Sequence, residues 1–253
     1  MNDKISKATA SEETIATKIV SFFKATILYT ILSLAAGVIG CLSPLLILLP
    51  FKMAAPVILI WCRIMMFVGA KVCGINVFLS GNIEKIHQPC VIVCNHQCLW
   101  ETIYLQLLLY PLSTILKRSL LHIPFFGWGL SLLKPIAIDR TSPMQSLKQV
   151  KNKGIERLRQ GRNILIFPEG TRRPVGQMGN YTRSAADIAK AANVPIIAIA
   201  HNGGKYWRSK VYNKKPGTIQ MVIGEPIVVG DQDTKEVMSS IQNWTQHQLD
   251  KME

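Results

Sequence analysis

The sequence predicts an α/β fold in which a mostly parallel central sheet is flanked by helices, preceded by an N-terminal membrane-embedded helical motif. After residue 74, short runs of apolar, often β-branched residues alternate with longer amphipathic segments, as in parallel strands joined by helices. Before that point, residues 25–51 carry no charged side chain. The length of 253 residues accommodates one large domain with such an attachment.

The uncharged stretch is longer than the roughly 20 residues that cross a bilayer core. It predicts a spanning helix near Ala25–Ser43, ended by Pro44 and Pro50. A helix that dips into one leaflet is the alternative. The apolar run over residues 52–74 is interrupted by Arg63 and Lys71, which predicts an interfacial helix that lies on the membrane or packs back on the first.

These patterns divide the chain into three parts. Residues 1–24 form a polar segment without the features of a secretory signal. Residues 25–74 form the membrane-anchoring helices, one spanning or leaflet-embedded and one interfacial, and residues 75–253 form an α/β domain. Basic residues follow the first helix, so we expect the α/β domain to face the cytoplasm, at the inner membrane of a bacterium.

The predicted elements of the α/β domain follow from apolar runs and from turn and cap signals. Strands are expected at Ile75–Leu79, Val91–Cys94, Ile115–Lys117, Pro135–Ile138, Ile164–Phe167, Pro195–Ala200 and Thr218–Ile223, with a turn at 80–82 after the first. Helices are expected at Thr102–Leu109, after the aromatic turn Ile123–Gly129, from Pro143 (capped by Ser142) to Gly161, at Ala185–Ala192, and after Asp233, where Glu236 completes a capping box.

The composition limits the partners. Lys and Arg number 29 against 15 Asp and Glu, a net charge of +14, which suits anionic partners such as lipid head groups or phosphorylated substrates. The six scattered cysteines indicate reduced thiols. Basic and aromatic residues are not interleaved over any long run, so we expect no nucleic-acid partner. The segment Lys205–Lys215 comes nearest, and we interpret it as a loop near the membrane or a docking patch for an acidic carrier protein.

A histidine and a glutamate mark the centre of the predicted site. His96 follows the strand Val91–Cys94, and Glu101 comes five residues later. Five helical positions would separate the two side chains by roughly 140°. The two can therefore meet only if His96 lies in the turn and Glu101 in the first helical turns. Such a carboxylate would fix the imidazole tautomer and stabilise the imidazolium. A loop histidine beside an exposed glutamate is the alternative.

A second group of residues suits phosphate. The strand at Ile164–Phe167 is followed by Glu169, Gly170, Thr171 and Arg172, and basic residues follow two other strands, Arg140 and Lys117. Because the ends of parallel strands meet at one edge of a sheet, we expect a phosphate pocket there, although any single charge could simply be solvated. Glu169 is the exception, since a carboxylate repels phosphate; we expect it to orient an arginine or a backbone amide.

These residues resemble four sequence blocks of the glycerolipid acyltransferases. The blocks are Asn95-His96 with Glu101, the segment Ile123–Trp128 leading to Ile138-Asp139-Arg140, the segment Phe167–Arg172, and Val194–Ile197. The chain resembles the 1-acylglycerol-3-phosphate acyltransferases in particular. One departure is Glu101, where the family usually has aspartate.

The resemblance implies acyl transfer from a thioester donor, acyl-CoA or acyl-carrier protein, to the free hydroxyl of lysophosphatidic acid at a membrane. It places His96 as general base held by Glu101, and Glu169 in the phosphate pocket. We expect oxyanion donors among backbone N–H groups near the His96 turn, and no cofactor or metal.

Alternatives remain open at this point. Other acceptors are glycerol-3-phosphate and a lyso-aminolipid, and another class is a non-catalytic basic membrane-binding protein. A cysteine acyl-enzyme at Cys94 or Cys98 is conceivable, whereas Cys90, Cys94, His96 and Cys98 match no common zinc spacing.

Overall fold

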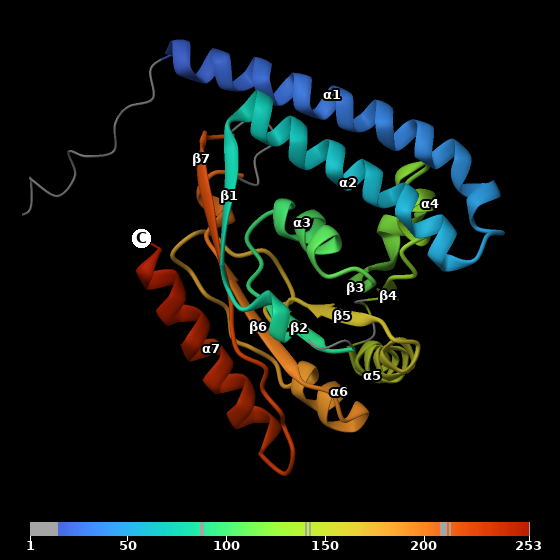
Figure 1. Cartoon of the computed structure of the whole chain (residues 1–253), viewed down its shortest axis with the longest axis vertical. Coiled ribbons are helices and arrows are strands. Elements are labelled where there is room, and N and C mark those ends of the chain that lie inside the picture. The colour runs from blue at the N-terminus through green and yellow to red at the C-terminus, as the bar shows by residue number, and fades with distance from the viewer. Residues whose placement is uncertain are drawn as a thin grey trace, which may run out of the picture.

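A computed structural model describes residues 15–86, 89–139, 141, 143–207, 212 and 214–252. Two long helices, α1 (Ile15–Leu46) and α2 (Phe51–Cys73), precede a seven-stranded sheet with helices on both faces (Figure 1). The predicted α/β class is confirmed.

The sheet has the order β1-β7-β6-β2-β5-β3-β4, and every neighbouring pair is parallel except β6 and β7. Its strands are β1 (Ile75–Gly81), β2 (Val91–Cys94), β3 (Leu112–Lys117), β4 (Ile136–Ile138), β5 (Asn163–Ile166), β6 (Ile196–His201) and β7 (Gly217–Ile223). All seven predicted strands are present. The turn predicted at 80–82 is wrong, because Ser80 and Gly81 continue the parallel pairing with β7.

The helices of the α/β domain are α3 (Trp100–Leu108), α4 (Phe126–Ser131), α5 (Pro143–Arg159), α6 (Ser184–Ala192) and α7 (Thr234–Lys251). Three single turns were not predicted: η1 (Ile83–Lys85), η2 (Arg118–His122) and η3 (Gly203–Lys205). The Asp233 carboxylate caps α7 by accepting from the N–H groups of Lys235 and Glu236. Ser142, the predicted cap of α5, lies outside the described residues.

The two faces of the sheet pack against different helices. Along β2, Val91 and Val93 join a core with residues of α5, α6 and α7, whereas Ile92 and Cys94 join the core formed with α2 and α3. This alternation follows from the two-residue period of a strand. It explains why the central strands read as continuous apolar runs rather than as alternating ones.

Helix α1 differs from its prediction at both ends. It is already helical at Ile15, and it continues through Pro44 to Leu46. Proline lacks the N–H that would bond the carbonyl four residues earlier, and here that carbonyl belongs to Gly40. The Ser43 hydroxyl donates to the Gly40 carbonyl instead, at 2.7 Å. The last turn is thereby satisfied without the proline N–H.

The α1–α2 hairpin lies along the α/β domain rather than standing away from it (Figure 1). Trp61 of α2 donates its indole N–H to the Leu32 carbonyl of α1, at 3.1 Å. Near one end of α1, the Ser21 hydroxyl donates to the Lys214 carbonyl, at 2.8 Å. Near the other end, Gly40 lies so close to Phe125 that a Cβ atom would collide with it. Both ends of α1 therefore touch the α/β domain.

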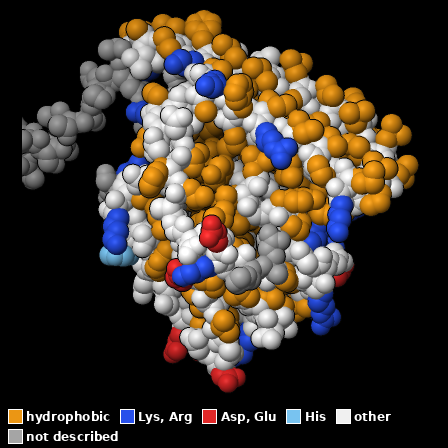
Figure 2. All heavy atoms as spheres, viewed as in Figure 1, with side chains coloured by type: hydrophobic (Ala, Val, Ile, Leu, Met, Phe, Trp, Pro, Cys, Tyr) orange, Lys and Arg blue, Asp and Glu red, His pale blue; other side chains and the backbone are white. Residues whose placement is uncertain are grey.

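Both helices are long and apolar enough to cross a membrane, by length and composition. Their outer face is strongly apolar, and Figure 2 shows hydrophobic side chains gathered over this end of the molecule. The exposed apolar residues of α1 include Ile19, Phe23, Leu34, Val38 and Leu45. A continuous exposed apolar surface of this kind indicates contact with lipid or with another apolar partner.

Candidate active site

The candidate site lies at the carboxyl ends of three neighbouring parallel strands. β2 leads into Asn95 and His96, β5 leads into the segment Phe167–Arg172, and β3 ends at Lys117. Since β2, β5 and β3 are adjacent and parallel, their ends gather at one edge of the sheet, where ligands bind in open α/β sheets.

His96 and Glu101 are in direct contact. The distance from His96 Nδ1 to Glu101 Oε1 is 2.7 Å. His96 lies in the turn before α3 and Glu101 is the second residue of that helix, which is the arrangement that their spacing requires. The Phe167 ring stacks on the imidazole, with ring centroids 4.1 Å apart. Because Nδ1 is engaged, Nε2 is the ring nitrogen that can exchange a proton with a ligand.

Glu101 is fully buried yet charged. Besides His96, its carboxylate accepts from the N–H groups of Gln97 (3.0 Å) and Cys98 (2.9 Å) and from the Cys98 thiol (2.8 Å). Burial by itself would raise the pKa of Glu101, but the hydrogen bonds that the carboxylate accepts from the His96 imidazole and the Cys98 thiol hold it below its ordinary value. The carboxylate is therefore ionised at neutral pH and orients His96.

The same hydrogen bonds overturn the expected oxyanion donors. The N–H of His96 donates to Glu169 Oε1, and those of Gln97 and Cys98 donate to Glu101. The N–H groups of His96, Gln97 and Cys98 are thus bound to carboxylates. A buried carboxylate requires such donors for itself, so the turn cannot also offer them to a reacting carbonyl.

Glu169 joins two loops. Its two oxygens accept from the N–H groups of His96 and Gly179, each at 3.0 Å, and Arg173 Nε lies 3.8 Å away. Burial raises the pKa of Glu169, and the two N–H bonds partly offset that effect. The expectation that Glu169 orients a backbone amide or an arginine is confirmed, and its carboxylate is occupied within the protein.

The other predicted phosphate ligands differ in their placement. Gly170 and Arg172 line the cavity described below, and so does Lys117. Gly170 has φ +70°, with open space where a Cβ atom would stand, so glycine serves the backbone conformation here more than the close approach of a ligand. Thr171 is exposed and does not line the cavity. Arg140 lies outside the described residues.

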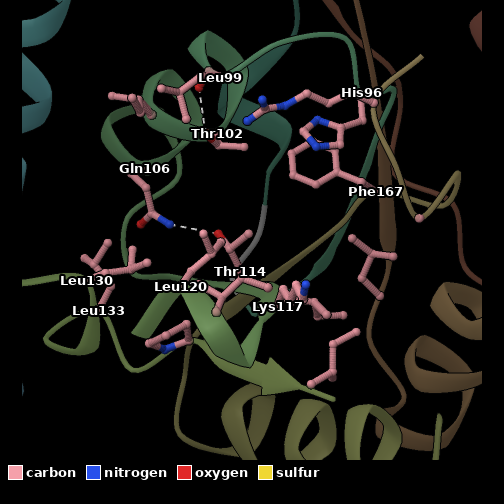
Figure 3. A pocket seen from close by; sticks show the side chains of 18 of the residues that line it. His96, Leu99, Thr102, Gln106, Thr114, Lys117, Leu120, Leu130, Leu133 and Phe167 are labelled. Atoms are coloured by element: carbon pink, nitrogen blue, oxygen red, sulfur yellow. Dashed lines mark hydrogen bonds between the residues drawn. The ribbon is translucent and has the colours of Figure 1, made fainter. Parts of the chain in front are cut away.

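A cavity of about 580 Å³ opens beside His96 (Figure 3). Its walls come from α1, α2, α3, β3, α4, α5 and β5 and are largely apolar. Of the described residues, Lys117 and Arg172 are its basic side chains besides His96. In the same wall, the Gln106 amide donates to the Thr114 hydroxyl at 2.9 Å, and Gln106 Oε1 has no hydrogen-bond partner among the residues that the structure describes.

The thiols are poorly placed for covalent chemistry. Cys94 and Cys98 are both buried and neither lines the cavity. Burial raises the pKa of each thiol well above its ordinary value, and Glu101 raises it further. The Cys98 thiol donates to Glu101 and the Cys94 thiol to the Asn95 carbonyl. Within the described residues, no group of three or more His, Cys, Asp and Glu side chains could hold a metal ion.

Sequence reasoning missed two contributors to the site. Phe167 is predicted as a strand end and as part of the block Phe167–Arg172, but its stacking on the His96 ring is not. Gln106 lies five residues beyond Glu101 on α3, and nothing in its local sequence marks it as a cavity residue. Both contacts depend on how distant elements pack.

Comparison with known proteins identifies the family. Residues 75–202 match the family model described as acyltransferase, and this region holds His96, Glu101, Lys117 and Arg172. The chain belongs to the acyltransferase family. The resemblance noted from the sequence blocks is thereby confirmed, and the protein is an acyltransferase.

Several relatives of this acyltransferase are named 1-acyl-sn-glycerol-3-phosphate acyltransferase. The chain is 46% identical over 207 residues to the 1-acyl-sn-glycerol-3-phosphate acyltransferase of Pseudomonas aeruginosa, covering 81% of this chain and 80% of that protein. It is 28% identical over 130 residues to the yeast protein of the same name, covering 50% and 43%. The crystal structure of the 1-acyl-sn-glycerophosphate acyltransferase from Thermotoga maritima has the same fold, with a TM-score of 0.76 and 21% identity over 93% of this chain and 97% of that one.

Proposed function

We propose that this acyltransferase transfers a fatty acyl group from an acyl thioester, either acyl-CoA or acyl-carrier protein, to the free hydroxyl of lysophosphatidic acid, which gives phosphatidic acid. The observation that carries the proposal is the pair formed by His96 and the buried Glu101, 2.7 Å apart, beside an apolar cavity that Lys117 and Arg172 also line. The name of the Pseudomonas relative supports the choice of acceptor.

His96 acts as the general base. Its Nε2 takes the proton of the acceptor hydroxyl while that oxygen attacks the thioester carbonyl carbon. The C–S bond then breaks, and the proton passes from His96 to the departing thiolate. Glu101 holds the Nδ1 proton and stabilises the imidazolium between the two steps. Base help of this kind contributes typically about 10²–10⁴-fold.

The acceptor phosphate binds at the basic edge of the cavity. Arg172 offers a planar fork that matches phosphate oxygens, and Lys117 adds a second positive charge from the end of β3. Gly170 shapes the loop that carries Arg172. Arg140 and Thr171 are assisting ligands in the same proposal, and Glu169 contributes by holding the His96 turn rather than by contacting phosphate.

In this proposal the site works at the lipid surface, beside the apolar helices α1 and α2. Because both ends of α1 touch the α/β domain, the leaflet-embedded arrangement fits the geometry better than a helix that spans the bilayer. The α1–α2 hairpin then lies in the cytoplasmic leaflet of a bacterial inner membrane, with residues 75–253 in the cytoplasm. Acyl chains reach the cavity from the leaflet past Ala36, Ile39 and Ile58, which line it.

An acceptor panel tests the proposal. Purified protein in detergent receives acyl-CoA or acyl-carrier protein with lysophosphatidic acid, glycerol-3-phosphate or a lyso-aminolipid, and mass spectrometry identifies the lipid products. We expect phosphatidic acid as the main product, and its loss in the His96→Ala variant without loss of folded protein. The matched control is His247→Ala, because His247 is exposed on α7. Preference for another acceptor, or normal turnover by His96→Ala, contradicts the proposal.

A further inference from the structure

A second histidine, His201, stands directly behind the proposed catalytic turn. It is the last residue of β6, the strand next to β2, and it is 0% exposed. It does not line the cavity, so it cannot touch a substrate there. Its surroundings are Asn95, Gly203, the Trp100 ring at 5.9 Å between centroids, and the titratable side chains of Glu101 and His96.

The hydrogen bonds of His201 fix its protonation. The N–H of Gly203 donates to Nδ1 at 3.0 Å, and a backbone N–H can only donate. Nε2 lies 2.9 Å from the Asn95 carbonyl, which can only accept. The ring is therefore neutral with its proton on Nε2. A second proton on Nδ1 would face the Gly203 N–H and break that contact. Burial lowers the pKa of His201 and acts in the same direction, although Glu101 and the Asn95 carbonyl partly oppose it.

Asn95 and His201 are tied together by two more bonds. The Asn95 side chain accepts from the His201 N–H and donates to the His201 carbonyl, each at 3.0 Å. The amide thus extends the pairing of β2 with β6 one residue past the end of the ladder. With the Nε2 contact, three hydrogen bonds join these two buried residues.

These contacts hold one peptide plane from both sides. The peptide between Asn95 and His96 has its carbonyl bound by His201 Nε2 and its N–H bound by Glu169 Oε1. The next residue, Gln97, accepts from the Gly204 N–H at 3.0 Å through its side chain. The backbone of the turn is therefore oriented by β6 on one side and by the loop after β5 on the other, before Glu101 orients the imidazole.

We propose that His201 is a positioning residue that fixes the Asn95–His96 peptide, so that His96 Nε2 stays aligned with the acceptor hydroxyl. The inference rests on the proposed function for its effect on turnover. Its structural part, a neutral ring locked by Asn95 and Gly203, is independent of any substrate. Misplacement of a reacting group by about 1 Å can cost about 10²-fold in rate, which sets the expected size of the effect.

The first test uses the unmodified protein. Histidine side chains labelled with ¹⁵N report their tautomers by long-range ¹H–¹⁵N NMR in detergent. We expect one ring with its proton on Nε2 that does not titrate between about pH 6 and 8.5, and it should be assigned by its absence in His201→Gln. A ring that carries its proton on Nδ1, or that titrates near its ordinary pKa, overturns the inference even if acyl transfer is normal.

The second test separates positioning from folding. We expect His201→Leu to lower kcat about 10²-fold with the KM for lysophosphatidic acid within about twofold, and to disturb the His96 ring signals. His201→Gln can still donate to the Asn95 carbonyl, so it should recover most of kcat and serves if His201→Leu does not fold. His247→Gln is the exposed matched control. A folded His201→Leu with an unchanged kcat and an unshifted His96 signal refutes the inference, and so does a folded His201→Gln whose kcat falls about 10²-fold. A wild-type protein inactive on every acceptor refutes the proposed function and leaves the tautomer result standing.

Discussion

Replacing Glu101 by glutamine removes one negative charge from the centre of the site with little change of shape. The glutamine oxygen can take the place of Oε1 and keep the bonds from His96 Nδ1, Gln97 N and Cys98 N. The amide group then faces the Cys98 thiol, which must turn away, at a cost of about 1 kcal/mol of unfolding free energy. The variant should therefore fold.

The catalytic cost should be much larger. During transfer His96 becomes positively charged next to Glu101, and charges about 4 Å apart interact by about 4 kcal/mol at an effective dielectric constant of 20. Loss of that interaction predicts a kcat lower by about 10³-fold, since each 1.36 kcal/mol is tenfold.

The assay measures release of free thiol from acyl-CoA in the presence of lysophosphatidic acid, with the unfolding midpoint recorded for each variant. Glu101→Asp keeps the charge on a shorter side chain, so its kcat should lie between those of the wild type and Glu101→Gln. Glu225→Gln is the control, since it removes only an exposed ion pair with Lys85. A kcat for folded Glu101→Gln within tenfold of wild type would refute the role assigned to the carboxylate.

Three further predictions use other parts of the structure. Arg172→Ala should raise the KM for lysophosphatidic acid more than the KM for the thioester donor, and steady-state kinetics with each substrate varied would show the reverse if Arg172 binds the donor. The pKa of His201 is lowered from 6.5 in the fold, so the stability that its neutral ring provides is present above pH 6.5 and declines as the pH falls below it. The thermal unfolding midpoint should therefore fall with acidification, and it should fall less steeply in His201→Gln. Equal slopes in the two proteins would contradict the assigned role of His201. Cys41 is exposed on α1, whereas the other five cysteines are buried. If α1 lies in one leaflet, a membrane-impermeant maleimide should not label the protein in sealed vesicles of either orientation. Labelling of Cys41 from either side would exclude that arrangement.

Much of the fold could be predicted because it rests on local patterns. The runs Val91–Cys94 and Ile164–Phe167 are apolar, short and followed at once by polar residues, so their strands and the edge that they share follow from periodicity and from the rule that parallel strand ends meet. The contact between His96 and Glu101 needed only helix geometry, because both residues belong to one turn and the helix after it.

Other features required the folded chain. The sequence placed a helix end at Pro44, but the Ser43 hydroxyl satisfies the Gly40 carbonyl and the helix continues. The sequence predicted that backbone N–H groups of the His96 turn serve as oxyanion donors, but these N–H groups donate to the Glu101 and Glu169 carboxylates. Both outcomes depend on which partner a polar group finds once water is excluded.

Local sequence patterns sufficed to predict the α/β class, the apolar N-terminal helices, and the residues His96, Glu101, Lys117 and Arg172 at strand ends or just beyond them. The folded arrangement was needed to show that Phe167 stacks on His96, that α1 lies along the domain, and that His201 holds Asn95 from 106 positions away. The physical reason is the sequence separation of the interacting residues. Periodicity, caps and spacing reflect interactions between residues close in sequence, whereas these contacts form when distant segments pack and exchange hydrogen bonds in a buried interior.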